Sequence, residues 1–271
     1  MVKSIEELHK IDLDIVKDFK RICDENEFKY YMIGGTLLGA IRHGGFIPWD
    51  DDIDIGMPRD DYEKFLLIAN DELKKNLKIS NFKTNEKYQY YISRIIDLNN
   101  PIVEKRIGNN NKNVHASIDI FPIDGTPNNF FIRKLYYFRV MFHRALMSLY
   151  YRDSIDKERK RSKTESILVF ILEKIPFERI ISASHEKNKI DKILKSQSID
   201  KSDNIGTIMG AYRTREIVPK IYFSSGREYK FEDIYLNGPS MYDEYLTHMY
   251  GKYMDIPSLD ERKSHFEFEE N

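Results

Sequence analysis

The chain has almost no cysteine and almost no net charge, and these two absences narrow the class of protein. A single cysteine, Cys23, stands among 271 residues. Neither a disulfide framework nor a cysteine-rich zinc site can form, and a reducing compartment is expected. With a formal net charge of −1, the chain is not a general binder of polyanions, and no large basic surface with interleaved aromatic residues indicates a nucleic-acid partner.

Long apolar runs and a secretion signal are also missing. The first ten residues, MVKSIEELHK, lack the apolar core of a signal peptide. No window reaches about 18 uncharged apolar residues, the length that a membrane-spanning helix needs. Because 41% of the residues are apolar and 32% are charged, the composition is that of a globular chain, and we expect it in the cytoplasm.

The order of periodic segments predicts an α+β fold, in which a mixed sheet carries flanking helices and the C-terminal part is mostly helical. We expect residues 1–128 to form the catalytic core. Residues 129–271 are expected to pack on it and to complete an acceptor site. The predicted helices span 4–25, 36–43, 58–70, 129–151, 165–196 and 239–251, a charged linker spans 152–163, and the predicted strands span 29–33, 51–57, 88–97, 101–107 and 114–121.

Four aspartates fall within five positions, in the stretch WDDDIDIGM. Residues two apart in a strand point the same way, so Asp52 and Asp54 share a face while the intervening isoleucines point into the core. Asp119 repeats this pattern in SIDIF. Carboxylates crowded in this way repel one another unless a cation lies between them, and hard oxygen ligands favour Mg²⁺ or Mn²⁺.

The alternative interpretation of these acids is a solvated acidic loop. The alternation with isoleucines favours a metal site for Asp52, Asp54 and Asp119. Asp50 fits either interpretation, and Asp51 is expected to be a surface or capping residue. Asp124, which lies between Pro122 and Gly125, is predicted to be a turn residue.

A Gly34-Gly35 turn precedes the acids. A glycine turn at a helix start presents backbone N–H groups that suit phosphate, and Thr36 is expected to help satisfy those groups. The turn is neither a Walker A motif nor a dinucleotide fingerprint. Close helix packing is the alternative explanation for Gly35 and Gly39. A strand, a Gly-Gly turn, a helix and an Asp-Ile-Asp strand together place phosphate beside metal.

This arrangement resembles the nucleotidyltransferase superfamily, and the sequence of its motifs resembles the LicD family more closely. The stretches that carry the resemblance are GGTLLGAIRHGGFIPWDDDIDIGMPRDDYEKF, IDIFPIDG and YLTHMYGKYMDIPSLDERKSH, and the likeness extends over about residues 5–265. That family includes bacterial phosphocholine transferases, with fukutin and its related protein as distant members. The resemblance implies a nucleotidyltransferase-like core.

The resemblance also implies an activity: metal-dependent transfer of a phospho-alcohol from a CDP-linked donor to a sugar hydroxyl of a cell-envelope glycan, with release of CMP. Asp52 and Asp54 would hold the metal, and Asp119 would complete a two-metal site or take the acceptor proton. The donor phosphates would lie at Gly34, Gly35 and Thr36.

Three further residues are candidates for substrate contact. Arg42 is expected to reach the phosphates, with a surface arginine as the alternative. Arg94 stands where the family often has lysine, so it either binds phosphate or lies at a strand edge. Trp49 stacks on a ligand or clamps its loop, and His43 is expected to be structural.

Two other functions remain open. A nucleotidyltransferase would use the same acids but would attack a nucleotide triphosphate and release pyrophosphate. A catalytically silent glycan- or lipid-binding module would keep the fold without the chemistry, which the intact acids argue against.

Residues 131–163 carry ten Lys or Arg residues and three Asp or Glu residues, and the first two-thirds of the segment are rich in aromatic and aliphatic side chains. One interpretation is a helix that lies on an anionic membrane surface, which would suit a lipid-linked acceptor. The other is an ordinary packing helix with its apolar side on the catalytic core.

Overall fold

A mixed sheet organises the part of the chain that this computed structural model describes, namely residues 2–85, 88–104, 112–151, 181–262 and 266–267. The strand order is β1-β2-β5-β4-β10, with β3 also on β4 and with β6 and then β7 continuing from β5. The strands are β1 (Tyr31–Met32), β2 (Asp54–Pro58), β3 (Leu77–Ser80), β4 (Ser93–Glu104), β5 (Lys112–Gly125), β6 (Asn204–Gly206), β7 (Ile217–Pro219) and β10 (Phe266–Glu267). A separate hairpin pairs β8 (Arg227–Phe231) with β9 (Ile234–Gly238).

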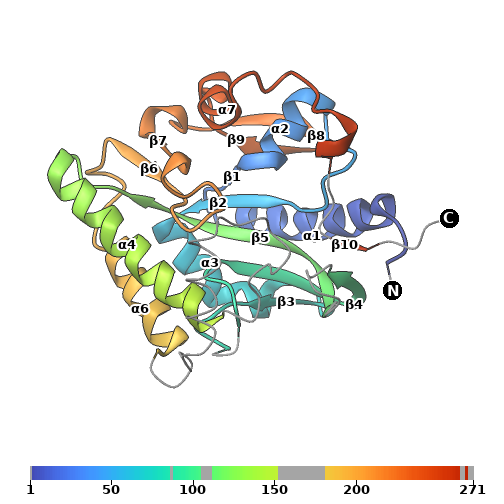
Figure 1. Cartoon of the computed structure of the whole chain (residues 1–271). Helices are drawn as coiled ribbons and strands as arrows, with labels where there is room; N and C mark the ends of the chain where they lie inside the picture. The colour runs from blue at the N-terminus through green and yellow to red at the C-terminus, as the bar shows by residue number, and fades with distance from the viewer. Residues whose placement is uncertain (1, 86–87, 105–111, 152–180, 263–265, 268–271) are drawn as a thin grey trace.

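Helices surround this sheet, as Figure 1 shows. The helices are α1 (Ile5–Glu25), α2 (Gly34–His43), α3 (Arg59–Glu72), α4 (Phe130–Tyr150), α6 (Ala183–Leu194) and α7 (Tyr242–Tyr250). α1 and α3 contact β5, whereas α2, α7 and the β8–β9 hairpin gather beyond β1 and β2. α4 and α6 pack against each other at the side of the molecule (Figure 1).

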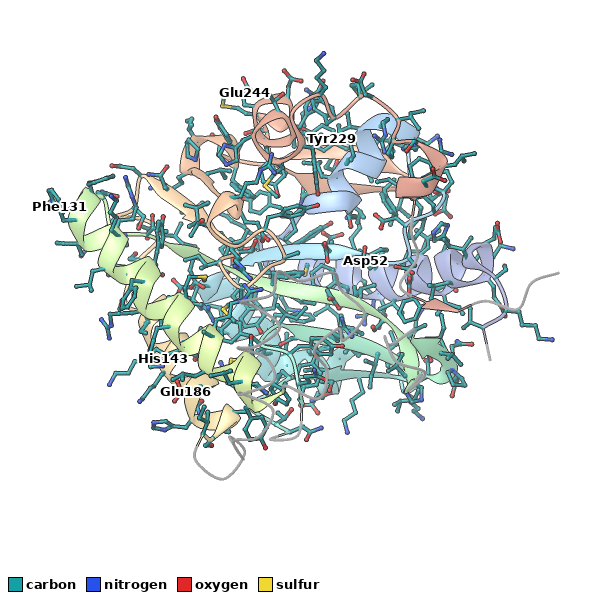
Figure 2. All side chains as sticks on the ribbon, viewed as in Figure 1. Asp52, Phe131, His143, Glu186, Tyr229 and Glu244 are labelled. Atoms are coloured by element: carbon teal, nitrogen blue, oxygen red, sulfur yellow. The ribbon has the colours of Figure 1, made fainter. Side chains whose placement is uncertain are left out.

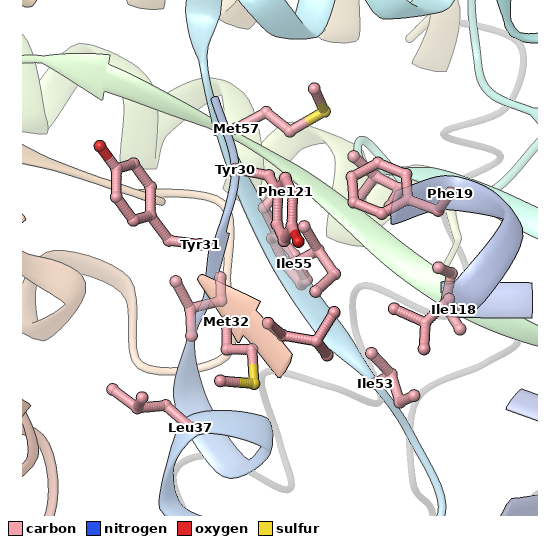
Figure 3. Packing of buried hydrophobic residues seen from close by; sticks show 14 of the residues in the cluster. Phe19, Tyr30, Tyr31, Met32, Leu37, Ile53, Ile55, Met57, Ile118 and Phe121 are labelled. Atoms are coloured by element: carbon pink, nitrogen blue, oxygen red, sulfur yellow. The ribbon is translucent and has the colours of Figure 1, made fainter. Parts of the chain in front are cut away.

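The core lies where the apolar face of α1 meets the apolar side of β2 and β5. Phe19 is fully buried there, together with Ile53, Ile55 and Ile118 (Figure 3). These isoleucines alternate with the acids along each strand, so the side chains that build the core also force the acids to the other face. The core therefore determines which face of the sheet carries the chemistry.

The first predicted helices are confirmed, with one correction. The side chain of Ser4 caps α1 by accepting the N–H of Glu7, and Gly44 ends α2 in a left-handed conformation with φ of 75°. The prediction that Thr36 satisfies the first N–H groups of α2 is wrong. The helix begins at Gly34, and the buried Thr36 hydroxyl instead accepts the N–H of Asp54 at 2.7 Å. Thr36 thus joins α2 to β2.

The middle strands differ in their bounds from the prediction. The strands expected at 88–97 and 101–107 are one strand, β4, whose pairing with β5 shifts between Ile96 and Pro101. Residues 105–107, the predicted linker at 152–163 and the first part of the helix predicted at 165–196 lie outside the described residues. The last part of that helix is confirmed by α6.

The C-terminal part contributes strands as well as helices. β6 pairs with β5, and β10 pairs with β4, so the sheet includes residues from both sides of position 128. The α+β class is confirmed, while the division into residues 1–128 and 129–271 stays a prediction.

Asp124 is not the turn residue that the sequence predicted. It lies buried in β5, where Arg59 donates to both of its carboxylate oxygens, at 2.7 Å from Nε and 2.5 Å from Nη2. Arg59 also donates to Asp191 of α6 at 3.1 Å and to the Tyr91 hydroxyl at 3.2 Å. This buried network joins β5 to the start of α3 and to the end of α6.

Asp124→Asn is expected to lower the free energy of unfolding by about 3 kcal/mol, because removing one partner leaves Arg59 buried with part of its charge uncompensated. Urea unfolding followed by circular dichroism measures the change. The control is Asp24→Asn, which removes the exposed Lys20–Asp24 pair and should cost less than about 1 kcal/mol. Equal losses in the two variants would contradict a structural role for the network.

Candidate active site

Three charged side chains occupy neighbouring positions on adjacent strands. Asp54 of β2 is the register partner of Asp119 on the parallel strand β5, and Arg94 of β4 is the antiparallel partner of Asp119. Directly paired residues project from the same face of a sheet, so the three side chains form one row across β2, β5 and β4. The sequence prediction that Asp54 and Asp119 come together is therefore supported by the strand register.

Asp52 lies two residues before Asp54, just ahead of the start of β2. It precedes the strand proper, yet the predicted alternation holds, because Ile53 is fully buried while Asp52 and Asp54 are partly exposed. The backbone is held in place here, since the N–H of Asp119 donates to the carbonyl of Ile53 at 2.8 Å. Figure 2 shows Asp52 near the middle of the molecule, close to the ribbon of β2.

Arg94 is the counter-charge of Asp119. Its Nη2 donates to Oδ2 of Asp119 at 3.1 Å, and its Nε lies 2.6 Å from Oδ1 without being directed at it for a hydrogen bond. The guanidinium also lies 4.2 Å from the ring centroid of Tyr90. Although burial favours the neutral form, Asp119 raises the pKa of Arg94 above its ordinary value. The arginine therefore stays charged beside the acids.

The charged neighbours with the largest effect on Asp54 are other acids. Burial raises its pKa well above the ordinary value, and the neighbouring charges of Asp52, Asp119 and Asp50 add to the rise. An ionised Asp54 in this position requires a positive charge close to it.

The two glycines of the turn lie directly against the acids. A Cβ on Gly34 would come 3.2 Å from Oδ2 of Asp54, and a Cβ on Gly35 would come 2.6 Å from Oδ2 of Asp50. Gly34 also has a positive φ of 55°. Its N–H is donated to the hydroxyl of Tyr245 at 3.2 Å. The N–H groups that α2 offers at this point are therefore those of Gly35 and Thr36, in the first helical turn, where intrahelical acceptors are absent.

Asp51 is buried, contrary to the expected surface position. Its Oδ2 accepts the N–H of Phe266, at 3.0 Å, and so holds β10 near the start of β2. In this sense Asp51 does cap a backbone group, but one that is 215 residues away along the chain. Only the folded structure brings that partner into view.

Arg42, His43 and Trp49 form a cluster at the end of α2. Nη1 of Arg42 donates to the carbonyls of Tyr253 at 2.8 Å and of Asp255 at 3.1 Å. The ring of Trp49 packs edge-on against His43 and has the guanidinium of Arg262 4.4 Å from its centroid. These contacts favour the clamping interpretation of Trp49 and the structural one of His43. The expected phosphate contact of Arg42 stays a prediction.

Asp12 is a buried acid that the sequence analysis missed. It lies inside α1, fully buried, and neither carboxylate oxygen has a hydrogen-bond partner among the described residues. Burial raises its pKa well above the ordinary value, and Asp52, Asp51 and Asp119 raise it further. A signal for it existed, since Asp12 falls four residues after Leu8 and three before Ile15, on the apolar side of the helix.

A pocket of about 530 Å³ opens beside Asp119 and Arg94. Arg144 of α4 lines it and donates to the carbonyls of Ile208 at 3.2 Å and Gly210 at 2.9 Å. A larger pocket of about 1160 Å³ lies past the ends of β2 and β5, and its lining includes none of Asp52, Asp54 and Asp119. Of Asp52, Asp54 and Asp119, only Asp119 lines the smaller pocket. This pocket is the candidate substrate site because Asp119 and its partner Arg94 both belong to the row across β2, β5 and β4.

Glu216 organises the loop of residues 207–216 that walls this pocket. It is buried and accepts the hydroxyl of Thr207 and, at 2.7 Å, the N–H of Tyr212. Gly210 is required beside it, since a Cβ there would come 2.0 Å from a Glu216 oxygen. The ring of Tyr212 packs against Tyr250 at 5.8 Å between centroids. Nothing in the periodicity of the sequence pointed to Arg144 or Glu216.

The donor set of the site consists of carboxylate oxygens, which suit Mg²⁺ or Mn²⁺. In the described part of the chain, no three His, Cys, Asp or Glu side chains are arranged to share one ion. The chemistry of the acids and the raised pKa of Asp54 fit a divalent cation nevertheless. Occupancy by metal stays a prediction.

Comparison with known proteins shows the family of the chain. Residues 27–181 match the family described as LicD/FKTN/FKRP, nucleotidyltransferase domain. The lipopolysaccharide cholinephosphotransferase LicD of Haemophilus influenzae is 30% identical over 268 residues, which cover 97% of this chain and 96% of that protein. The human ribitol 5-phosphate transferase FKRP is 54% identical over 33 residues, which cover 12% of this chain and 7% of that protein. The chain belongs to the LicD family, and it is accordingly an enzyme, a phosphotransferase of the LicD type.

Gly35→Ala is expected to reduce transferase activity strongly while leaving stability unchanged or slightly higher. The added Cβ would displace the Asp50 carboxylate, whereas alanine in a helix is favoured over glycine by up to about 1 kcal/mol. Gly34→Ala is the companion variant, and its positive φ predicts a stability loss of roughly 1–2 kcal/mol. Thermal unfolding and activity measured on the same samples test both expectations. A Gly35→Ala enzyme with normal activity would contradict the close approach.

Asp12→Ala is expected to raise the free energy of unfolding by about 1 kcal/mol, because it removes a buried polar group without partners and improves helix propensity. Urea unfolding measures the change. The control is Asp14→Ala, on the same helix and less buried, which should change stability by no more than about 0.5 kcal/mol. A marked loss of stability in Asp12→Ala would show that Asp12 has a partner in the working enzyme.

Proposed function

We propose that the chain transfers a phospho-alcohol, phosphocholine in the first place, from a CDP-linked donor to a sugar hydroxyl of a cell-envelope glycan. The observation that supports this most directly is the row of Asp54, Asp119 and Arg94 beside the Gly34-Gly35 turn. The similarity to a lipopolysaccharide cholinephosphotransferase along nearly the whole chain supports the choice of phosphocholine.

In this reaction the acceptor oxygen forms a bond to the phosphorus that carries the alcohol. The bond from that phosphorus to the bridging oxygen of the diphosphate breaks, and CMP leaves with the electron pair. Such transfers depend on positioning and charge stabilisation more than on covalent catalysis. Asp119 lies in the wall of the pocket and is the residue we propose to take the proton of the acceptor hydroxyl.

Asp52 and Asp54 are proposed to hold Mg²⁺ or Mn²⁺, with Asp50 as a further oxygen donor. Completing a two-metal site is the alternative role of Asp119. A divalent ion held there would supply positive charge to the diphosphate. Of the chain's own groups, Arg94 and Arg144 bring positive charge to the pocket. The N–H groups of Gly35 and Thr36, in the first turn of α2, would donate to phosphate oxygens of the donor. Together these groups would orient the donor with its alcohol in the pocket.

The identity of the leaving group separates this proposal from a nucleotidyltransferase that uses a nucleotide triphosphate. The enzyme is incubated with CDP-choline, CDP-ribitol, CDP-glycerol, CTP or ATP, together with a cell-envelope glycan extract. Release of CMP and a phospho-alcohol mass increase on the glycan are expected. Pyrophosphate release would favour the alternative instead, and no turnover together with no Mg²⁺ binding would favour a silent binding module.

Asp52→Asn and Asp54→Asn are each expected to lower CMP release at least about 10²-fold while the fold is kept, because each change removes a charged ligand from a preorganised site. Titration with Mg²⁺ or Mn²⁺, followed by calorimetry, should show weaker binding in both variants. Asp60→Asn, on the exposed start of α3, is the control and should behave like the unmodified enzyme. Near-normal turnover in either site variant would remove that residue from the site.

We also propose that the enzyme works in the cytoplasm, at the inner face of the membrane, where a lipid-linked glycan would meet the donor. The free and buried Cys23 fits a reducing compartment.

A further inference from the structure

Helix α4 has two apolar sides, and the described residues that pack on it cover one of them. Tyr136, Val140 and Met147 are buried on the inner side, where they pack with Ile190 and Leu194 of α6. A short hydrogen bond between His143 and Glu186 joins the same two helices, and both residues lie between them in Figure 2. This side is the packing helix that one interpretation of the sequence expected.

The outer side of α4 is an exposed apolar stripe. Phe131 is 78% exposed, Leu135 59%, Phe138 67% and Phe142 51%. Their spacing of four, three and four residues places all four on one face of the helix, over roughly 16 Å of its length. Figure 2 shows Phe131 at the outer edge of the molecule, far from Asp52. Four large apolar side chains in one exposed row are unusual on the surface of a soluble protein, and such a patch indicates an interaction site.

The charged side chains of α4 itself are all of one sign. α4 contains no Asp or Glu residue, and its cations Lys134 and Arg139 are exposed. On a helical wheel these two residues fall on opposite flanks of the stripe. An apolar stripe with basic flanks is the pattern of helices that lie in the interface of an anionic bilayer.

We infer that the outer face of α4, formed by Phe131, Leu135, Phe138 and Phe142 with Lys134 and Arg139, docks on an anionic lipid surface. Two copies of this face would bring like charges together, which disfavours self-association. No helix among the described residues has the length and apolar content to span a membrane, so α4 lies along the surface. The apolar rings enter the headgroup region, and the cations meet the lipid phosphates.

Docking through α4 would place the pocket close to the lipid surface. Arg144, Met147 and Ser148 of the same helix line the pocket that contains Asp119. One helix therefore connects the bilayer to the candidate substrate site, and a glycan carried on a lipid would reach the pocket from the surface on which the enzyme rests. Access of a lipid-linked glycan to the pocket rests on the proposed function. The docking itself is tested by flotation, which requires no turnover.

The test is flotation of the full chain with vesicles rich in phosphatidylglycerol. Flotation at low salt and release at high salt are expected, since screening weakens the attraction of the cations. The double variant Lys134→Gln/Arg139→Gln should bind about fivefold more weakly for each cation removed. The double variant Phe131→Gln/Phe138→Gln should bind at least about tenfold more weakly. The control Leu67→Gln removes an apolar side chain that is 81% exposed on α3, and it should float as the unmodified chain does.

Several outcomes would overturn the inference. They are absence of flotation at low salt, equal binding to phosphatidylcholine vesicles, and flotation that neither double variant changes. If a second copy covers the face, the phenylalanine variant converts a dimer to a monomer in light scattering and no flotation is seen. If residues 152–180 cover it, the phenylalanine variant lowers the melting temperature and no flotation is seen. A floating monomer whose melting temperature is the same in all variants supports the bilayer.

Because flotation is independent of catalysis, failure of the docking surface leaves the transferase proposal intact. Conversely, a chain that floats but releases no CMP from any donor would retain the docking surface and lose the proposed reaction.

Discussion

The parallel pairing of β2 with β5 is the constraint on which the site depends. It places Asp54 opposite Asp119, and β4 then adds Arg94 in the next position across. A slip of one residue in either strand would turn its acids into the core and its isoleucines toward the pocket. Burial of Ile53, Ile55, Ile118 and Ile120 therefore fixes the register, and the hydrophobic core fixes the positions of the acids.

The cost of this arrangement is a concentration of negative charge. Arg94 offsets Asp119, but burial and the neighbouring acids raise the pKa of Asp54. Burial also raises the pKa of Asp12, and the charges of Asp52, Asp51 and Asp119 add to the rise. A divalent cation at Asp52 and Asp54 would relieve the repulsion, which gives the proposed metal a physical reason beyond family resemblance. The glycines at 34 and 35 let the start of α2 lie directly against Asp54 and Asp50.

The parts of the site that sequence predicts are those carried by local pattern. Asp52, Asp54 and Asp119 each stand directly next to a core isoleucine in the sequence, and period-two alternation is a strong signal. Asp51 and Asp124 also lie next to these motifs, but their roles come from Phe266 and Arg59, which are distant in the chain. Arg144 and Glu216 belong to segments without a pattern. Residues whose function depends on a distant partner cannot be found from spacing, and this is why the wall of the pocket was missed.

The role of α4 could not be settled from its sequence either, because two interpretations were open. Its sequence fitted both a packing helix and a membrane-surface helix, because both require apolar residues at helical spacing. The structure shows that the apolar residues divide between two sides, with Tyr136 and Val140 buried and Phe131 and Phe138 exposed. Packing on α6 therefore does not exclude a surface contact, because it uses different residues. One side holds α4 in the fold, where Arg144 reaches the pocket, and this leaves the other side free to set the position of the whole enzyme relative to its acceptor.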